Sequence, residues 1–220
     1  MTNEKAGAWA LILGALSFVA LMVAHPSHVE GAPIIGTLTL GAIVHGTAFA
    51  TQPILLFGFW QLTQWSGDRA LARLALCFYG LAAMLTILAA SMSGLIIPQI
   101  IAVAHHAQGA LMPGPVDPNS LQPLANYSVW LNRSFASVHV VYFAVAMLLW
   151  SIAWSRKGIL GWIVRAVGAL VGVGVIAWAV SGTMTLEAQH GALMVTLVQM
   201  AWTLLAAAAM LMSRDTKEEI

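Results

Sequence analysis

The sequence predicts an all-α integral membrane protein built as a bundle of six transmembrane helices. Of its 220 residues, 60% are hydrophobic and only 8% are charged, whereas soluble domains carry about 25% charged residues. So few charged side chains cannot cover a water-soluble surface, so we expect the chain to be embedded in the lipid bilayer. At this length we expect residues 1–220 to form a single domain. The formal net charge of +1 provides no basic field, so no nucleic-acid partner is expected.

Six stretches each supply the roughly 20 mostly apolar residues that a helix needs to cross a bilayer. They occupy about residues 8–24, 35–62, 71–97, 133–154, 158–180 and 191–212. Pro53 lies inside the second stretch and predicts a kink, whereas Pro98 should halt or bend the third. All six are too continuously apolar for the alternating pattern of a barrel strand.

One long connection, residues 98–132, separates the third and fourth predicted spans. Its first part, PQIIAVAHHAQGALM, has apolar residues at helical spacing and predicts a short helix at the outer interface. Its second part, PGPVDPNSLQP, contains four prolines and one glycine and predicts an irregular loop. We expect this structured outer loop either to cap a cavity or dock a partner, or simply to connect two distant helices.

The basic residues predict the orientation of the spans, because short cytoplasmic loops are enriched in Lys and Arg. Eight of the nine basic residues fall on one side of the six-span arrangement, and only Arg133 falls on the other. Both termini are therefore expected in the cytoplasm, in a multi-pass protein of the inner (plasma) membrane. In the fifth span, Gly168 and Gly172 have the small-xxx-small spacing of closely packed helices, and we expect them to serve packing within the chain rather than dimerisation.

All seven histidines fall on the outer side of this topology: His25, His28, His105 and His106 in loops, His190 at the start of the sixth span, and His45 and His139 inside spans. A rise of about 1.5 Å per residue places His45 and His139 roughly 25 and 22 Å above the inner boundary, at nearly the same level. Each lies on a stripe of small and polar residues, which predicts a face turned toward the bundle because lipid offers no hydrogen-bond partner.

His45 and His139 are therefore the predicted cofactor ligands, since paired histidines from two helices can hold a haem iron axially. The site would take haem b or a transition metal ion such as copper, iron or zinc. Glu187 and His190 form an E-x-x-H spacing that can supply a further pair of metal ligands. Arg133 could pair with a haem propionate, an anionic substrate, an acidic side chain or a lipid headgroup. Alternatively, the two histidines are hydrogen-bonded core residues or line a solute pocket.

Three functions are compatible with this pattern, and whether the protein is an enzyme stays open. The first is a membrane redox or electron-transfer protein with an outward-facing histidine site and a quinone or periplasmic electron carrier as partner. The second is a small-solute or metal-ion transporter with a histidine-lined outer vestibule. The third is an accessory subunit of a larger membrane complex, without chemistry of its own. The middle of the membrane contains no Asp, Glu, Lys or Arg, which disfavours an ion-coupled pump, although a neutral pathway could be lined by Gln52, Thr86, Thr196 and Gln199.

Overall fold

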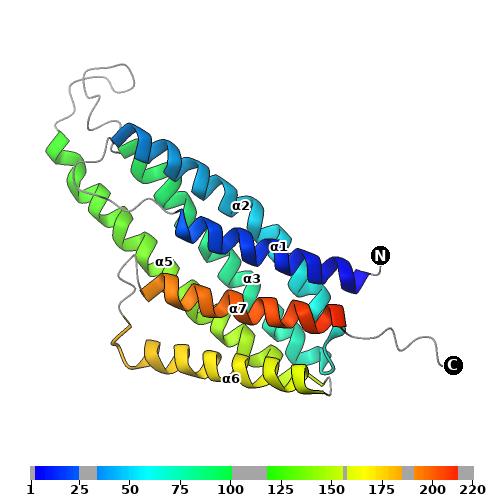
Figure 1. The fold of residues 1–220 in the computed structure, drawn as a ribbon. Coiled ribbons are helices and arrows are strands. Elements are labelled where there is room, and N and C mark those ends of the chain that lie inside the picture. Colours follow the sequence, from blue (N-terminus) through cyan, green and yellow to red (C-terminus); the bar gives the residue numbers. More distant parts are fainter. Residues whose placement is uncertain (1–2, 25–33, 101–117, 156–157, 185–190, 213–220) are drawn as a thin grey trace.

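The computed structural model describes residues 3–24, 34–100, 118–155, 158–184 and 191–212, which are almost entirely helical (Figure 1). Within these ranges the elements are α1 (Asn3–Val23), α2 (Ile34–Trp65), α3 (Arg69–Ser91), the π-helical turn η1 (Met92–Ile96), α5 (Pro118–Ala153), α6 (Ile159–Val180) and α7 (Gly191–Met212). Five of the helices are long and apolar enough to cross a membrane. The helix outside this group, α2, packs along α1 and α3. The chain is therefore a multi-pass membrane protein.

Five helices form a closed ring, and the remaining helix covers one side of it. Around the ring, α1 packs on α2, α2 on α3, α3 on α5, and α7 on both α5 and α1, while α6 packs against α5 and α7 (Figure 1). Consecutive helices run in opposite directions, so α1 begins and α7 ends at the same end of the bundle. This arrangement determines which faces of the helices point into the ring.

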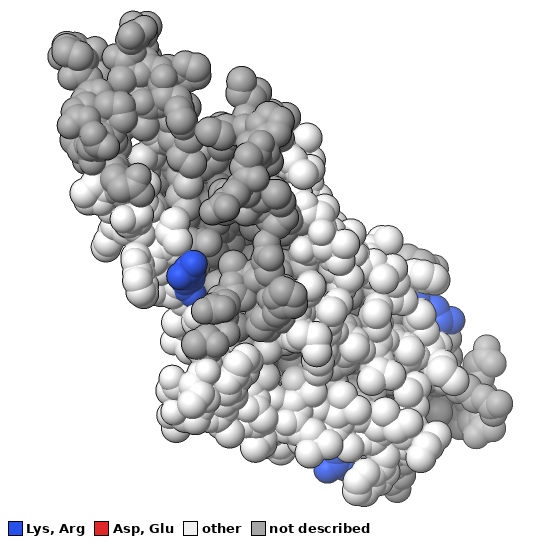
Figure 2. Space-filling model, turned by 60° about the vertical axis from the view of Figure 1, so that its left-hand side comes forward, with Lys and Arg blue, Asp and Glu red and all other residues white. Residues whose placement is uncertain are grey.

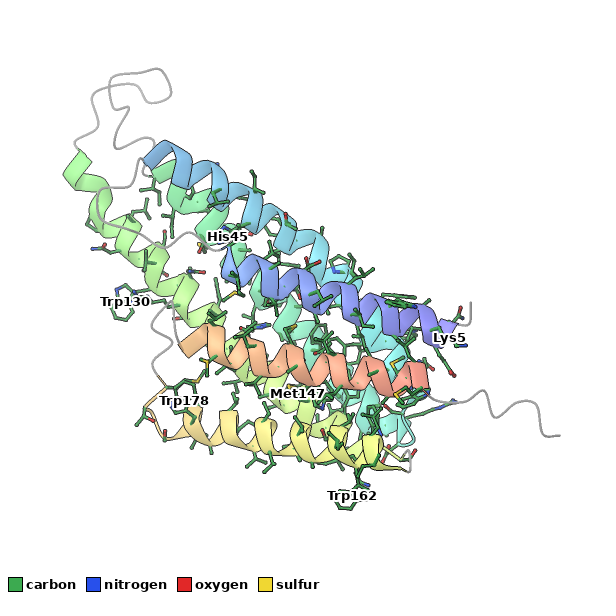
Figure 3. All side chains as sticks on the ribbon, viewed as in Figure 1. Lys5, His45, Trp130, Met147, Trp162 and Trp178 are labelled. Atoms are coloured by element: carbon green, nitrogen blue, oxygen red, sulfur yellow. The ribbon has the colours of Figure 1, made fainter. Side chains whose placement is uncertain are left out.

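The two ends of the bundle differ in charge. Lys5 and Trp162 lie at one end, and Trp130 and Trp178 lie at the other (Figure 3). We call the first the basic end, because α1, α3 and α6 begin there and bring with them Lys5, Arg69, Arg73 and Arg165. Between the ends, the described surface in Figure 2 is almost entirely uncharged. The bundle thus presents an apolar band between two interfacial rims, as a bilayer requires.

The proline near the end of the third predicted span bends the helix without ending it. Pro98 lacks an N–H group, and its ring would crowd the carbonyl of Gly94, four residues before it. The helix widens into η1 just there, with the N–H of Ile97 donating to the carbonyl of Met92, five residues back. Helical geometry then continues to Ile100. The wider turn therefore accommodates the proline and lengthens this helix beyond its predicted end.

The fourth helix begins fifteen residues before the predicted boundary at residue 133. Pro118 is its first residue, where the missing N–H costs nothing, and Pro123 follows in the second turn. The expected irregular loop is therefore wrong for residues 118–123, and residues 118–132 are helical instead of part of a loop. The expected interfacial helix lies mostly in residues 101–117, outside the described ranges. With 36 residues, α5 is much longer than α1, α6 and α7, which have 21 or 22.

Gly168 and Gly172 of α6 lie at close contacts within the chain, as expected. A Cβ atom at Gly168 would overlap Ser151 Oγ of α5 and Trp202 Nε1 of α7. At Gly172 it would lie 2.9 Å from both the Ala144 carbonyl oxygen and the Leu148 Cβ of α5. The small residues therefore let α6 sit in the groove between α5 and α7.

We expect Gly168→Leu to destabilise the bundle by about 1–3 kcal/mol, because overpacking a close helix contact forces side chains off their rotamers. The matched control is Gly174→Leu on the same helix, since nothing in the described structure lies within 4 Å of a Cβ at that position. Thermal unfolding in detergent, followed by size-exclusion chromatography, measures the difference. Equal melting temperatures for the two variants would contradict the assignment of Gly168 to the internal contact.

Candidate functional site

A belt of buried polar side chains crosses the middle of the ring. Gln52, His139 and Gln199 come from α2, α5 and α7 and are only 2%, 8% and 0% exposed. Each of them lies about 20 Å, counted along its own helix, from the helix end at the basic end. Tyr79 and Thr86 of α3 make hydrogen bonds with two of them. We call these five residues the polar belt.

His139 is held through one ring nitrogen. Its Nδ1 lies 3.0 Å from the carbonyl oxygen of Ala82 and 2.7 Å from Thr86 Oγ1. The Thr86 hydroxyl in turn donates to the Ala82 carbonyl, at 3.1 Å. A carbonyl oxygen can only accept, and a bare ring nitrogen 3.0 Å from it would set two lone pairs against each other, so we assign the ring proton to Nδ1. A neutral imidazole in this tautomer carries a bare lone pair on Nε2.

Aromatic rings flank the imidazole of His139. The ring of Phe18 in α1 is stacked on it, with centroids 6.3 Å apart and an interplanar angle of 30°. Phe143, one turn further along α5, lies 6.2 Å away. These contacts and the two hydrogen bonds at Nδ1 fix the orientation of the ring and hence the direction of Nε2.

The two glutamines of the belt each have one satisfied end. Gln199 Nε2 donates to the carbonyl oxygen of Val140 at 3.0 Å, and Gln52 Oε1 accepts from the Tyr79 hydroxyl at 3.4 Å. Within the described ranges, their other ends and the second nitrogen of His139 are buried without a hydrogen-bond partner: Gln52 Nε2, Gln199 Oε1 and His139 Nε2. We call these the three open atoms of the belt.

The open atoms are costly in a lipid-embedded bundle. A buried polar group without a hydrogen bond costs about 1–3 kcal/mol in proteins, and bulk water does not reach a bilayer core to relieve it. Such atoms therefore call for water molecules or a ligand that the ring encloses. This is the chemistry of a binding site for a molecule that forms hydrogen bonds.

The belt is closed toward the basic end by stacked aromatic rings, which we call the aromatic cluster. Phe59 of α2 stacks on Trp150 of α5, with centroids 4.7 Å apart, and lies 4.2 Å from Tyr79. Trp150 continues the stack to Trp202 of α7 at 6.1 Å. The rings are fully buried or nearly so, and Trp150 Nε1 donates to the Thr63 hydroxyl. The half of the ring next to the basic end is therefore filled by well-packed side chains.

Two helix irregularities lie at or beyond the belt. Pro53, inside α2, directly follows Gln52, and η1 interrupts α3 further from the basic end. Interrupted helices in membrane proteins are tolerated where the freed backbone is buried in protein or lines a cavity, and they often mark binding sites. Their position is therefore consistent with a site at the belt.

The two histidines predicted as a ligand pair face α3 at different levels. His45 is 8% exposed and donates from Nδ1 to the Gly41 carbonyl at 2.6 Å. It packs so closely on Gly94 that a Cβ atom there would overlap the Cβ of His45. His139 faces Ala82 and Thr86 instead, which lie about 18 and 12 Å nearer the basic end than Gly94 along α3. The expectation of a common level is therefore wrong, because each imidazole was counted from its own span end without the register between the helices.

The other predicted site residues do not extend this arrangement. Glu187 and His190 lie outside the described residues, as do the four loop histidines. Arg133 is exposed on α5, six residues nearer the far end than His139. Among the described residues, no group of three or more His, Cys, Asp or Glu side chains converges as a metal site would. Sequence reasoning included Gln52, Thr86 and Gln199 as lining residues but missed Tyr79, whose hydroxyl within an apolar run was the available signal.

We expect His139→Phe to leave the melting temperature of the ligand-free protein unchanged or to raise it. Phenylalanine keeps a ring between Phe18 and Phe143 and removes an open atom, while Thr86 still donates to the Ala82 carbonyl. His139→Ala, the comparison variant, should destabilise by about 2–4 kcal/mol because it leaves a cavity. Thermal unfolding in detergent measures both, and equal losses in the two variants would mean that Nε2 has a protein partner.

No comparison with known proteins assigns a function to this site. No known protein family matches the sequence, and neither the curated proteins nor the solved structures contain a match. The polar belt and the aromatic cluster are therefore the features that bear on its function.

Proposed function

We propose that the protein is a carrier for a small neutral solute in the inner (plasma) membrane, with all six helices crossing the bilayer. The observation that carries the proposal is the set of three open atoms, held in buried side chains of α2, α5 and α7, three helices of the ring. A molecule that forms hydrogen bonds there would offset the cost of burying them. This function corresponds to a solute transporter with the site on the outer side.

The direction of access follows from the positive-inside rule. We place the basic end in the cytoplasm, and with it both termini, because Lys and Arg are enriched on that side. The aromatic cluster then closes the cytoplasmic half of the ring, and the polar belt would be reached from outside. Pro53 and η1 supply the helix irregularities at which such a bundle could change shape during transport.

The solute is neutral because the belt offers no charge to balance an ionic one. Each belt residue is a glutamine, threonine or tyrosine apart from His139, whose proton on Nδ1 is explained by the neutral tautomer. A charged group at this depth would need an opposite charge or extensive hydration. Among the described arginines, the nearest one along α5, Arg133, is exposed at the far end.

Uptake by reconstituted vesicles tests the proposal. Glycerol or urea should enter vesicles that contain the protein faster than protein-free vesicles, as measured by stopped-flow light scattering. His139→Phe should slow the protein-dependent rate about 5- to 30-fold, the effect of losing one or two kcal/mol of binding. Thr47→Val is the matched control, since Thr47 is exposed on α2 and bonds only within its own helix. No protein-dependent flux, or equal rates in the two variants, would contradict the carrier.

A second candidate function is a membrane redox protein that binds haem b or a transition metal through His139. A metal-bound histidine commonly donates its other ring N–H to a carbonyl, which fixes the tautomer and leaves a lone pair for the metal. His139 meets this requirement through Ala82. His45 contacts α3 about 12–18 Å further along than His139 does, so it is not proposed as a second axial ligand. Further ligands would have to come from other parts of the chain or from the cofactor.

An absorption spectrum and elemental analysis of the purified protein separate the two candidates. A haem protein would show a Soret band, and a metalloprotein would contain a stoichiometric transition metal. Either signal should disappear in His139→Phe and persist in Thr47→Val, because only His139 offers a ring nitrogen in the belt. A colourless protein without bound metal, prepared without chelators, would contradict the redox function and leave the carrier.

A further inference from the structure

The polarity of the open atoms indicates what kind of solute the belt recognises. We infer that the solute is a neutral molecule with at least two hydrogen-bond donors, such as a polyol or a primary amide, and that molecules with acceptors alone are rejected. This inference rests on the proposed function and specifies the solute class of the same site.

The direction of the hydrogen bond at His139 is determined by Ala82. The Ala82 carbonyl accepts hydrogen bonds from the Thr86 hydroxyl and from Nδ1 of His139. Because the ring proton of the neutral imidazole is then on Nδ1, Nε2 can only accept. A solute meeting this nitrogen must therefore present an O–H or N–H group. An ether or ester oxygen at the same place would face a lone pair and be repelled.

Gln199 makes the same demand by an independent route. Its amide nitrogen is used by the Val140 carbonyl, which can only accept, so the amide cannot be turned round without losing that bond. The open atom is consequently the oxygen, a second acceptor. Since Val140 follows His139 directly in α5, the two acceptors belong to neighbouring positions of the ring.

Gln52 supplies the complementary group. Its oxygen accepts from the Tyr79 hydroxyl, which leaves two amide N–H groups on Nε2 to donate. The belt as a whole therefore presents two acceptors and one donor-bearing nitrogen. A solute with two donors and one acceptor is complementary to this set of atoms, and urea and short polyols both have this pattern.

The proximity of these residues follows from the register of the helices. Along α1 and α2, Gly14 packs on Leu55 and Gly7 on Gln61, a pairing that continues to bring Phe18 beside residues 51–52. Phe18 is also the ring stacked on His139. The register therefore brings the turn of α2 that contains Gln52 to the part of α1 that contacts His139, and Gln199 donates to the backbone of α5 at Val140, next to His139.

Matched pairs of small molecules test the inference on the full-length protein in detergent. The probes are urea with tetramethylurea, and ethylene glycol with 1,2-dimethoxyethane, measured by saturation-transfer difference NMR. The methylated partners keep the oxygen acceptors and lose every donor. The donor-bearing molecules should bind at least about tenfold more tightly, because the methylated ones leave buried acceptors unpaired.

Variants show whether the binding is at the belt. His139→Phe and Gln199→Met should each weaken urea and ethylene glycol about 5- to 30-fold, while Thr47→Val should leave them unchanged. Thermal unfolding identifies a belt variant that fails to fold, and probe binding is then compared with the other belt variant alone. Equal binding of methylated and unmethylated probes, or insensitivity to both belt variants, would overturn the inference while leaving a carrier of another solute class. Binding of neither member of either pair, together with no vesicle uptake, would remove the proposed function itself.

Discussion

The hydrogen bond between His139 and the Ala82 carbonyl determines the chemistry of the whole site. It joins α5 to α3, fixes the tautomer of the imidazole and leaves Nε2 as an acceptor. Thr86 reinforces it from the same helix by holding its own proton on that carbonyl. No water is present in a bilayer core to replace these hydrogen bonds. The Ala82 carbonyl therefore keeps the proton on Nδ1 of His139 and keeps Nε2 an acceptor.

The fold supports this site by packing its two halves differently. On the basic side of the belt, Phe59, Trp150 and Trp202 are fully buried and stacked across three helices, so that half is rigid. On the other side, η1 interrupts the regular backbone of α3, and Pro53 in α2 lacks the N–H that would bond the carbonyl four residues before it. The bundle thus has one half filled by stacked rings and one half with these two departures from regular helical bonding, an asymmetry that the proposed carrier would use.

Much of the fold could be predicted from the sequence, because the length and hydropathy of each apolar stretch indicate a membrane span. The ends of α6 and α7 were predicted to within a residue or so, since polar loops flank both. The start of α5 was misjudged because Pro118 and Pro123 suggested a loop, although a proline at the first position of a helix costs no hydrogen bond. The helical face of His139 predicted that it is buried. Its separation from His45 could not be predicted, because the periodicity of one helix contains no information on the register between helices. The aromatic cluster was missed for the same reason.

The unequal lengths of the helices affect the membrane around the protein. On one flank, α1, α6 and α7 have 21 or 22 residues and are about 32 Å long, which matches an ordinary hydrocarbon thickness. On the other flank, α2 and α5 have 32 and 36 residues and reach about 48 and 54 Å. Lipids on the two flanks therefore meet walls of different height, and the bilayer must tilt the long helices or thicken locally beside them. The energy of that adjustment depends on acyl-chain length, so membrane thickness bears on the geometry of the long helices that carry Gln52 and His139.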